Sequence, residues 1–271
     1  MIVDFHTHMF PDKIAKGTLE FLENVCKIKP YTDGTYAGLS KSTKEAGIDI
    51  SVALPAVTKT AQVDSVNRFA AQYQEAPVIS FGGIHPECEN YKNILRQIRD
   101  MGMKGIKLHP DYQEIYFNDI RYKRLIEYAT ELGLIVSVHA GSDPKCPFDV
   151  HCTPKMALEL LKDVKPDKLV LAHMGGNECW DEVEEYLVGE DVYFDTGVVL
   201  NRMPEEQFIR MVHTHGADKI LFATDSPWGG QKEFVEILTE MPLTLVEKAK
   251  IFAGNACRLL DIPIKNTIKN Q

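Results

Sequence analysis

The N-terminal stretch Ile2-Val-Asp-Phe-His-Thr-His-Met-Phe-Pro11 joins a short apolar run to two closely spaced histidines. The run Ile2–Phe5 has the length and composition of a buried parallel strand. A doubly wound nucleotide-binding sheet carries a glycine-rich phosphate loop after its first strand, and this chain has histidines there instead. The stretch therefore favours a closed parallel barrel over an open sheet.

Seven further runs of this kind recur along the chain, with helical patterns between them. The predicted strands are Ile2–Phe5, Ile48–Leu54, Val78–Ile84, Gly105–Leu108, Leu134–Val138, Leu169–Ala172, Val192–Phe194 and Ile220–Ala223. The predicted helices include Ala61–Glu75, Tyr91–Met101, Ile120–Leu132, Pro154–Asp163, Glu178–Leu187 and Pro204–His215. Eight strands in 271 residues give about 34 residues per unit, the size of one βα unit. We predict an α/β fold, a distorted (β/α)8 TIM barrel, as a single domain over residues 1–271.

The two ends of the chain depart from this repeat. The segment from Pro11 to Gly47 is longer than one crossover needs, so we expect an added helix or a flap over the barrel mouth there. Leu243–Leu260 is predicted to form a last helix, and Pro263–Gln271 a polar tail that frays.

Composition and charge narrow the class of protein. The chain has 30 Lys and Arg against 39 Asp and Glu, and the net charge of −9 argues against a nucleic-acid partner. The mean hydropathy is −0.19, and no apolar stretch approaches the ~18 residues of a membrane span. Because the N-terminus resembles no secretory signal and the six cysteines are scattered, we expect a cytoplasmic location with reduced thiols. A small-molecule substrate is the expected partner, and the sequence is compatible with a homo-oligomer.

Metal-ligand residue types recur where predicted strands end. They are His6, His8, His139, His173 and Asp225. The carboxyl ends of barrel strands gather in one cup, and alternate residues of a strand share a face, so His6, His8 and also Asp4 are expected to face one point. Imidazole and carboxylate suit zinc and similar divalent metals, and a water bound to such a metal ionises near pH 7. The pattern predicts a hydrolytic metal site in the cup.

Each of these residues also has a structural explanation when taken alone. A His-x-His pair arises by chance on surface strands, and His139 and His173 end apolar runs in which a core histidine is ordinary. Asp225 is placed to cap the next element. Five such coincidences at one end of a barrel are harder to explain by packing, and the joint pattern favours the metal site.

Further polar and aromatic residues follow other strands. Lys107, His85 and His109 are candidate substrate contacts, and Trp228 is expected to form a wall of the pocket. Both of these histidines precede proline, which favours an extended backbone. The loop residues Asp143, Cys146, His151 and Cys152 suggest a second metal cluster, although the cysteine spacing is not the one that zinc sites use.

Six motifs, in order, span nearly the whole chain. They are Asp4-Phe-His-Thr-His8, Gly105-Ile-Lys-Leu-His-Pro110, Val138-His-Ala-Gly141, Ala172-His-Met-Gly-Gly176, Ala223-Thr-Asp-Ser-Pro-Trp228 and Gly254-Asn-Ala-Cys-Arg-Leu-Leu260. With them the chain resembles the amidohydrolase superfamily, most of all the branch of amidohydrolase-related decarboxylases. The resemblance implies a barrel in which one divalent metal, zinc first and manganese second, is held by His6, His8, His139 and Asp225. It also implies that His173 polarises the substrate or orients a metal-bound water, that Asp225 shuttles a proton, and that Asp4 orients a ligand imidazole.

Lys107 leaves the number of metal ions open. In other branches of the superfamily a lysine on this strand is carboxylated and bridges two metals, and His173 would then join the second one. The alternative is an unmodified lysine that binds a substrate carboxylate or pairs with an acid, because an unpaired buried charge is costly. We favour the unmodified lysine and one ion.

The resemblance does not fix the reaction. A metal-dependent hydrolase of a small amide, lactone or ester-like substrate is the first expectation, and a non-oxidative decarboxylase of a small unsaturated or aromatic acid is the alternative. A deoxyribonuclease-like activity is disfavoured, because that branch has a ligand glutamate near the strand that carries Lys107 and because the negative charge repels phosphodiesters. A barrel that binds a metal or ligand without turnover is the non-enzymatic alternative.

Overall fold

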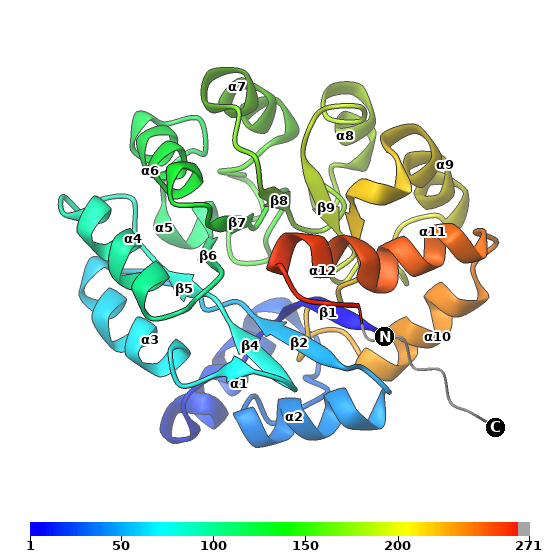
Figure 1. Cartoon of the computed structure of the whole chain (residues 1–271), viewed down its shortest axis with the longest axis horizontal. Helices are drawn as coiled ribbons and strands as arrows, with labels where there is room; N and C mark the ends of the chain where they lie inside the picture. Colours follow the sequence, from blue (N-terminus) through cyan, green and yellow to red (C-terminus); the bar gives the residue numbers. More distant parts are fainter. Residues whose placement is uncertain (265–271) are drawn as a thin grey trace.

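The computed structural model describes residues 1–264 and shows parallel strands surrounded by helices (Figure 1). The strands are β1 Val3–Thr7, β2 Ile50–Ala53, β3 Gln74–Glu75, β4 Val78–Ser80, β5 Gly82–Gly83, β6 Gly105–Leu108, β7 Ile135–Val138, β8 Leu169–Leu171, β9 Tyr193–Asp195 and β10 Ile220–Leu221. The α-helices are α1 Asp12–Cys26, α2 Tyr36–Glu45, α3 Val63–Ala70, α4 Tyr91–Asp100, α5 Pro110–Gln113, α6 Ile120–Glu131, α7 Pro154–Val164, α8 Trp180–Tyr186, α9 Glu205–His215, α10 Gln231–Glu240, α11 Leu245–Ala249 and α12 Asn255–Leu260. Each of the eight predicted strand segments overlaps an observed strand.

The strands form a TIM barrel whose hydrogen-bonded ladder is interrupted twice. One sheet has the order β1-β2-β4-β3 and the other β10-β9-β8-β7-β6-β5. Phe81 separates β4 from β5, so a single extended segment pairs with β2 before this residue and with β6 after it. At the second interruption the Phe5 amide donates to the Phe222 carbonyl over 2.9 Å, and Thr7 forms a parallel bridge with Ser226. The predicted distorted barrel is confirmed.

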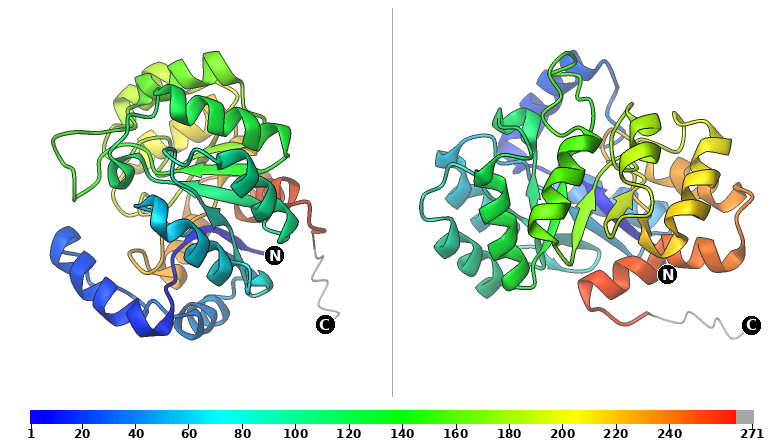
Figure 2. Two further views of the ribbon diagram at one scale, coloured as in Figure 1. Left: turned by 90° about the vertical axis from the view of Figure 1, so that its left-hand side faces the viewer. Right: turned by 90° about the horizontal axis from the view of Figure 1, so that it is seen from above.

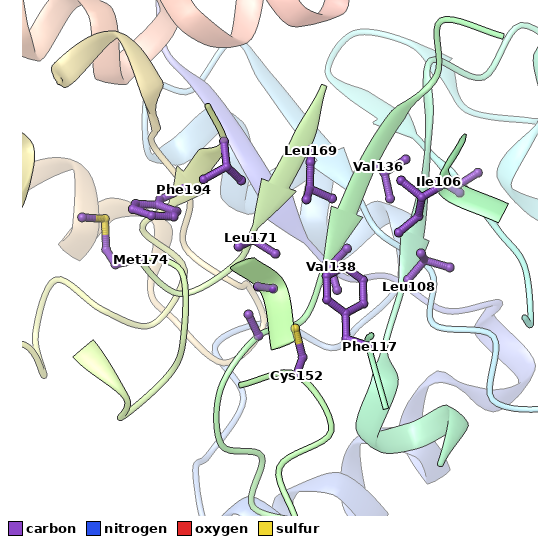
Figure 3. Close-up of a cluster of buried hydrophobic side chains, with 14 of the residues drawn as sticks. Ile106, Leu108, Phe117, Val136, Val138, Cys152, Leu169, Leu171, Met174 and Phe194 are labelled. Carbon is purple, nitrogen blue, oxygen red and sulfur yellow. The ribbon is translucent and has the colours of Figure 1, made fainter. Parts of the chain in front are cut away.

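Apolar side chains pack on both faces of the strands. Alternate residues such as Ile106, Val136 and Leu169 belong to a cluster that also contains helix residues, and Figure 3 shows part of it. A second cluster includes Phe5 and Val170 together with residues of α12. Helix α12 lies on the side of the barrel at which the chain begins, whereas α1 lies on the opposite side (Figure 2). The apolar clusters cover the faces of the strands, and polar residues lie at the carboxyl ends of the strands.

The structure corrects one predicted helix and refines two others. The helix predicted over Ala61–Glu75 ends at Ala70, and Gln74–Glu75 form β3, antiparallel to β4. The side-chain amide of Gln74 donates to the carbonyls of Ala70 and Ser80, which favours this turn. The long N-terminal segment contains α1 and α2, and the last predicted helix is present as α11, a π-helical turn over Lys250–Gly254 and α12. Residues 265–271 of the predicted tail lie outside the described residues. In residues 1–264, no helix combines the length and the apolar character that crossing a membrane requires.

Gly141, in the loop after β7, provides a test of this packing. Its φ is +82°, and an added Cβ would lie 2.1 Å from the backbone nitrogen of Asn177. We expect Gly141→Ala to lower the free energy of unfolding by about 2–5 kcal/mol, because a left-handed conformation and overpacking both destabilise. Urea unfolding measures the loss. Gly47→Ala is the matched control, since Gly47 has φ +70° but nothing within 4 Å of the added atom. An equal loss in both variants would contradict the packing explanation.

Candidate metal centre

Three predicted ligands converge where β1 and the segment after β10 meet. His6 and His8 present their Nε2 atoms to Asp225 Oδ1, at 3.3 and 2.9 Å. The backbone amide of Asp225 donates to the His6 carbonyl over 2.8 Å, which fixes the two segments to each other. We call His6, His8 and Asp225 the inner centre.

The inner centre fits a divalent cation. Asp225 Oδ1 is buried and, among residues 1–264, has no hydrogen-bond partner of acceptable geometry, although two imidazole nitrogens lie within 3.3 Å of it. Such an arrangement is typical of ligand atoms that face a common point rather than each other. Two imidazoles and a carboxylate are the donors that zinc and neighbouring divalent metals use.

The charges of the inner centre favour the same interpretation. Burial and the nearby ammonium of Lys107 lower the pKa of His6 to about 4, so its ring is neutral at pH 7. Burial would raise the pKa of Asp225, but interactions with His6 and His8 outweigh it and hold that pKa below its usual range. A neutral imidazole and an ionised carboxylate are the forms that bind metals.

Asp195, rather than Asp4, orients the His6 ring. Its Oδ2 lies 2.9 Å from His6 Nδ1, and its side chain is fully buried at the end of β9. Asp4 instead accepts hydrogen bonds from Thr224 and Gln231. The register of β1 against β2 shifts between Asp4 and Thr7, and this shift breaks the alternation that predicted a shared face. Asp195 directly follows the predicted strand Val192–Phe194, so the strand-end signal was also present there.

We expect Asp195→Asn to weaken binding of zinc or manganese by about 10–100-fold, the usual effect of losing a carboxylate that orients a ligand histidine. The amide retains the size of the side chain but removes the charge that stabilises the ring orientation. Competition with a chelator of known affinity measures the change. An unchanged affinity would show that His6 needs no such support.

His173 and His139 form a hydrogen-bonded pair beside the inner centre. His173 Nδ1 lies 2.9 Å from the Gly197 carbonyl, and His173 Nε2 lies 3.0 Å from His139 Nδ1. The ring centroids of His6 and His173 are 5.3 Å apart. The ligand atoms of His139 group with those of His109 and Asp143 and not with the inner centre. The structure therefore brings together three of the four predicted ligands, His6, His8 and Asp225. The fourth, His139, is separated from them by the ring of His173.

The predicted substrate contacts Lys107, His109 and His85 lie at different distances from the inner centre. Lys107 Nζ lies 3.3 Å from His6 Nε2, and burial lowers the pKa of Lys107 to about 8. His109 stacks on His139 with 4.1 Å between ring centroids. His85 accepts a hydrogen bond from the Glu87 amide over 3.3 Å. The cavity beside the centre is lined by none of Lys107, His85 and His109.

That cavity has a volume of about 80 Å³ and lies between the inner centre and α1. Its wall includes His139, His173, Asp225 and Trp228. Residues of α1 and the loop after it also line the cavity, namely Leu22, Val25, Cys26 and Ile28. The extra N-terminal segment therefore covers the mouth beside the predicted site.

Comparison with known proteins places this architecture in a family. Residues 3–262 match the sequence profile described as amidohydrolase, and the search of curated proteins found no match. Among solved structures, the 2,6-dihydroxybenzoate decarboxylase from Rhizobium is 16% identical with a TM-score of 0.74, covering 96% of this chain and 98% of the other. The 5-carboxyvanillate decarboxylase from Sphingomonas paucimobilis is 15% identical with a TM-score of 0.73 over 97% and 99% of the two chains. A dihydroxybenzoic acid decarboxylase from Polaromonas sp., solved with bound manganese, is 16% identical with a TM-score of 0.73 over 96% of each chain.

At these identities the structural likeness establishes the fold, and the sequence profile, which covers nearly the whole chain, establishes the family. The chain belongs to the amidohydrolase family.

Proposed function

We propose that the protein is a metal-dependent enzyme that removes carbon dioxide from a small unsaturated or aromatic carboxylic acid. The observation that carries this proposal is a cup with metal ligands and cationic side chains together. Lys107 Nζ lies beside His6 of the inner centre, and Arg202 lines the cavity. An anionic substrate is attracted to such a site, whereas a neutral amide or lactone gains little from the two cations. The names of the similar aromatic-acid decarboxylases support the same choice.

The residues of the cup have distinct proposed roles. A divalent cation held by His6, His8 and Asp225 would supply Lewis acidity to an oxygen of the acid. Arg202, which lines the cavity, would bind and orient the substrate carboxylate, and Lys107, buried beside His6, would attract it through its charge. His139 remains a sequence-based prediction for this centre and has no proposed role in it, because its Nδ1 lies against His173 and its Nε2 faces Asp111 and Asp143.

Loss of carbon dioxide requires a proton in return. The bond between the carboxyl carbon and the substrate carbon breaks, its electron pair stays on the substrate carbon, and that carbon takes a proton. His173 lines the cavity and its ring lies beside His6, so we propose that this ring, neutral in the resting site, takes up a proton when the acid binds and passes it to the substrate carbon. Asp225 is the second candidate, although its lowered pKa favours the ligand role.

Hydrolysis of a small amide, lactone or ester-like substrate is the second candidate function. The position of Asp225 favours it, because an ionised carboxylate within the inner centre can accept the proton of an attacking water. Both zinc and manganese are proposed as the cation, and the manganese bound in the Polaromonas structure favours manganese.

Product analysis separates the two functions. Purified protein loaded with manganese is incubated with a panel of hydroxylated benzoic acids and a panel of amides and lactones. We expect release of carbon dioxide from at least one acid, and none from the Asp225→Asn variant. Hydrolytic products without carbon dioxide would favour the second function. Full metal occupancy without turnover on either panel would contradict both and favour a barrel that only binds.

A further inference from the structure

A second group of ligand-type side chains lies outside the inner centre. Its members follow β6 and β7, and all are buried, with relative exposures of 7% or less. We call His109, Asp111, His139 and Asp143 the outer cluster. It differs from the two-metal arrangement expected for a carboxylated Lys107, because neither Lys107 nor His173 takes part.

The atoms of the outer cluster are too far apart for hydrogen bonds and suitably spaced for a shared cation. His139 Nε2 lies 3.9 Å from Asp111 Oδ2 and 3.9 Å from Asp143 Oδ2. His109 Nε2 lies 3.8 Å from Asp143 Oδ2. Hydrogen bonds of these types are about 2.7–3.2 Å long, whereas two ligands about 2.0–2.2 Å from one metal can be separated by more than this.

The hydrogen bond made by His139 Nδ1 determines whether His139 Nε2 carries a proton or a free lone pair. The Gly197 carbonyl can only accept, so His173 Nδ1 donates to it, and in a neutral ring His173 Nε2 is then an acceptor. His139 Nδ1 must donate to that atom, which leaves the lone pair of His139 on Nε2. This lone pair faces carboxylate oxygens on two sides. Within residues 1–264, His139 Nε2 and Asp111 Oδ2 have no hydrogen-bond partner.

The rest of the outer cluster is fixed by contacts that leave these atoms available. Asp111 Oδ1 accepts from the His151 amide, at 3.1 Å, and Asp143 Oδ1 from the Lys145 amide, at 2.8 Å. The His109 ring is stacked between Tyr112 and His139, with centroid distances of 3.7 and 4.1 Å. Asp111 Oδ2 therefore has no hydrogen-bond partner among residues 1–264, and Asp143 Oδ2 faces the rings of His109 and His139.

We propose that the outer cluster binds a second divalent cation through Nε2 of His109 and His139 and Oδ2 of Asp143, with Asp111 Oδ2 beside it, 3.9 Å from His139 Nε2. Imidazoles combined with carboxylates suit zinc and manganese. A cation there would balance two buried carboxylates and bind a lone pair that nothing else satisfies. Of the loop residues that the sequence grouped as a second metal cluster, Asp143 takes part. Cys152 belongs to the apolar core, and Cys146 Sγ is directed to the Asp111 carbonyl.

Metal stoichiometry tests this proposal without an activity assay. Metal-free protein is dialysed to equilibrium with manganese chloride, and in a second series with zinc chloride, and bound metal is measured by mass spectrometry. We expect two ions per chain in the parent protein. Asp143→Asn and His109→Gln should each retain one ion. Asp225→Asn should also retain one, because it removes the inner ion and leaves the outer cluster intact.

Control variants separate site loss from unfolding. His213→Ala removes an exposed histidine outside both clusters and should retain two ions. Asp143→Glu keeps the carboxylate and should restore part of the affinity that Asp143→Asn loses. Circular dichroism of each metal-free variant verifies that it is folded.

Two results would overturn the outer site. One is a parent protein that binds a single ion which Asp143→Asn and His109→Gln leave in place. The other is a second ion that survives both substitutions. Full retention of metal by Asp225→Asn would instead contradict the inner centre of the proposed function, so the two failures are distinguishable.

Discussion

Asp225→Asn is expected to lose the inner cation and reduce turnover to background. Asparagine has the size of aspartate and tolerates the left-handed backbone at this position, where φ is +62°, so the fold should persist. What is lost is the negative charge that lies 2.9 and 3.3 Å from the Nε2 atoms of His8 and His6. Because Asp225 would bind the metal directly, its affinity should fall by more than the about 10–100-fold expected for Asp195→Asn.

The measurement is metal affinity and the rate of product formation in the same preparation. Thermal unfolding of the metal-free variant verifies the fold, and excess manganese tests for rescue. Partial rescue at high metal concentration is expected if the substitution acts through metal binding. An unchanged metal affinity would remove Asp225 from the ligand set.

His173→Asn is expected to lower kcat by about 10²–10⁴-fold, the range attributed to one positioned proton-transfer group. The asparagine amide retains a donor that can serve the Gly197 carbonyl, and it tolerates the left-handed backbone of His173, at φ +60°. Because His173 is outside the inner centre, the inner ion should remain. Substrate affinity should change little, since Arg202 and the charge of Lys107 are proposed to hold the substrate.

Steady-state kinetics combined with metal analysis test this division of roles. A loss of kcat with retained metal and a nearly constant KM supports proton transfer by His173. Loss of the inner ion would identify His173 as a metal ligand, which is the arrangement expected if Lys107 were carboxylated. Loss of the outer ion alone would instead follow from the missing hydrogen bond to His139. An unchanged kcat would contradict the proposed role.

Much of the barrel could be predicted because chain order and apolar runs determine it. Residues at the carboxyl ends of parallel strands gather at one end of a barrel, so His6, His8 and Asp225 could be predicted as neighbours without knowledge of side-chain positions. Their convergence in the structure depends on backbone hydrogen bonds, such as that from the Asp225 amide to the His6 carbonyl, which join segments far apart in sequence.

The remaining features depend on tertiary contacts that no local pattern records. The register shift in β1 turns Asp4 towards Thr224 and Gln231, and leaves the support of His6 to Asp195 from β9. The ring orientation of His139 follows from the Gly197 carbonyl through His173. Strict alternation along a strand cannot predict either arrangement, because each requires a partner from a distant loop or strand.

Anomalous diffraction from crystals grown with manganese tests the central claim most directly. The account predicts an anomalous peak about 2.0–2.2 Å from His6 Nε2, His8 Nε2 and an oxygen of Asp225. Absence of a peak at that position, or a structure in which these three side chains point away from one another, would contradict it.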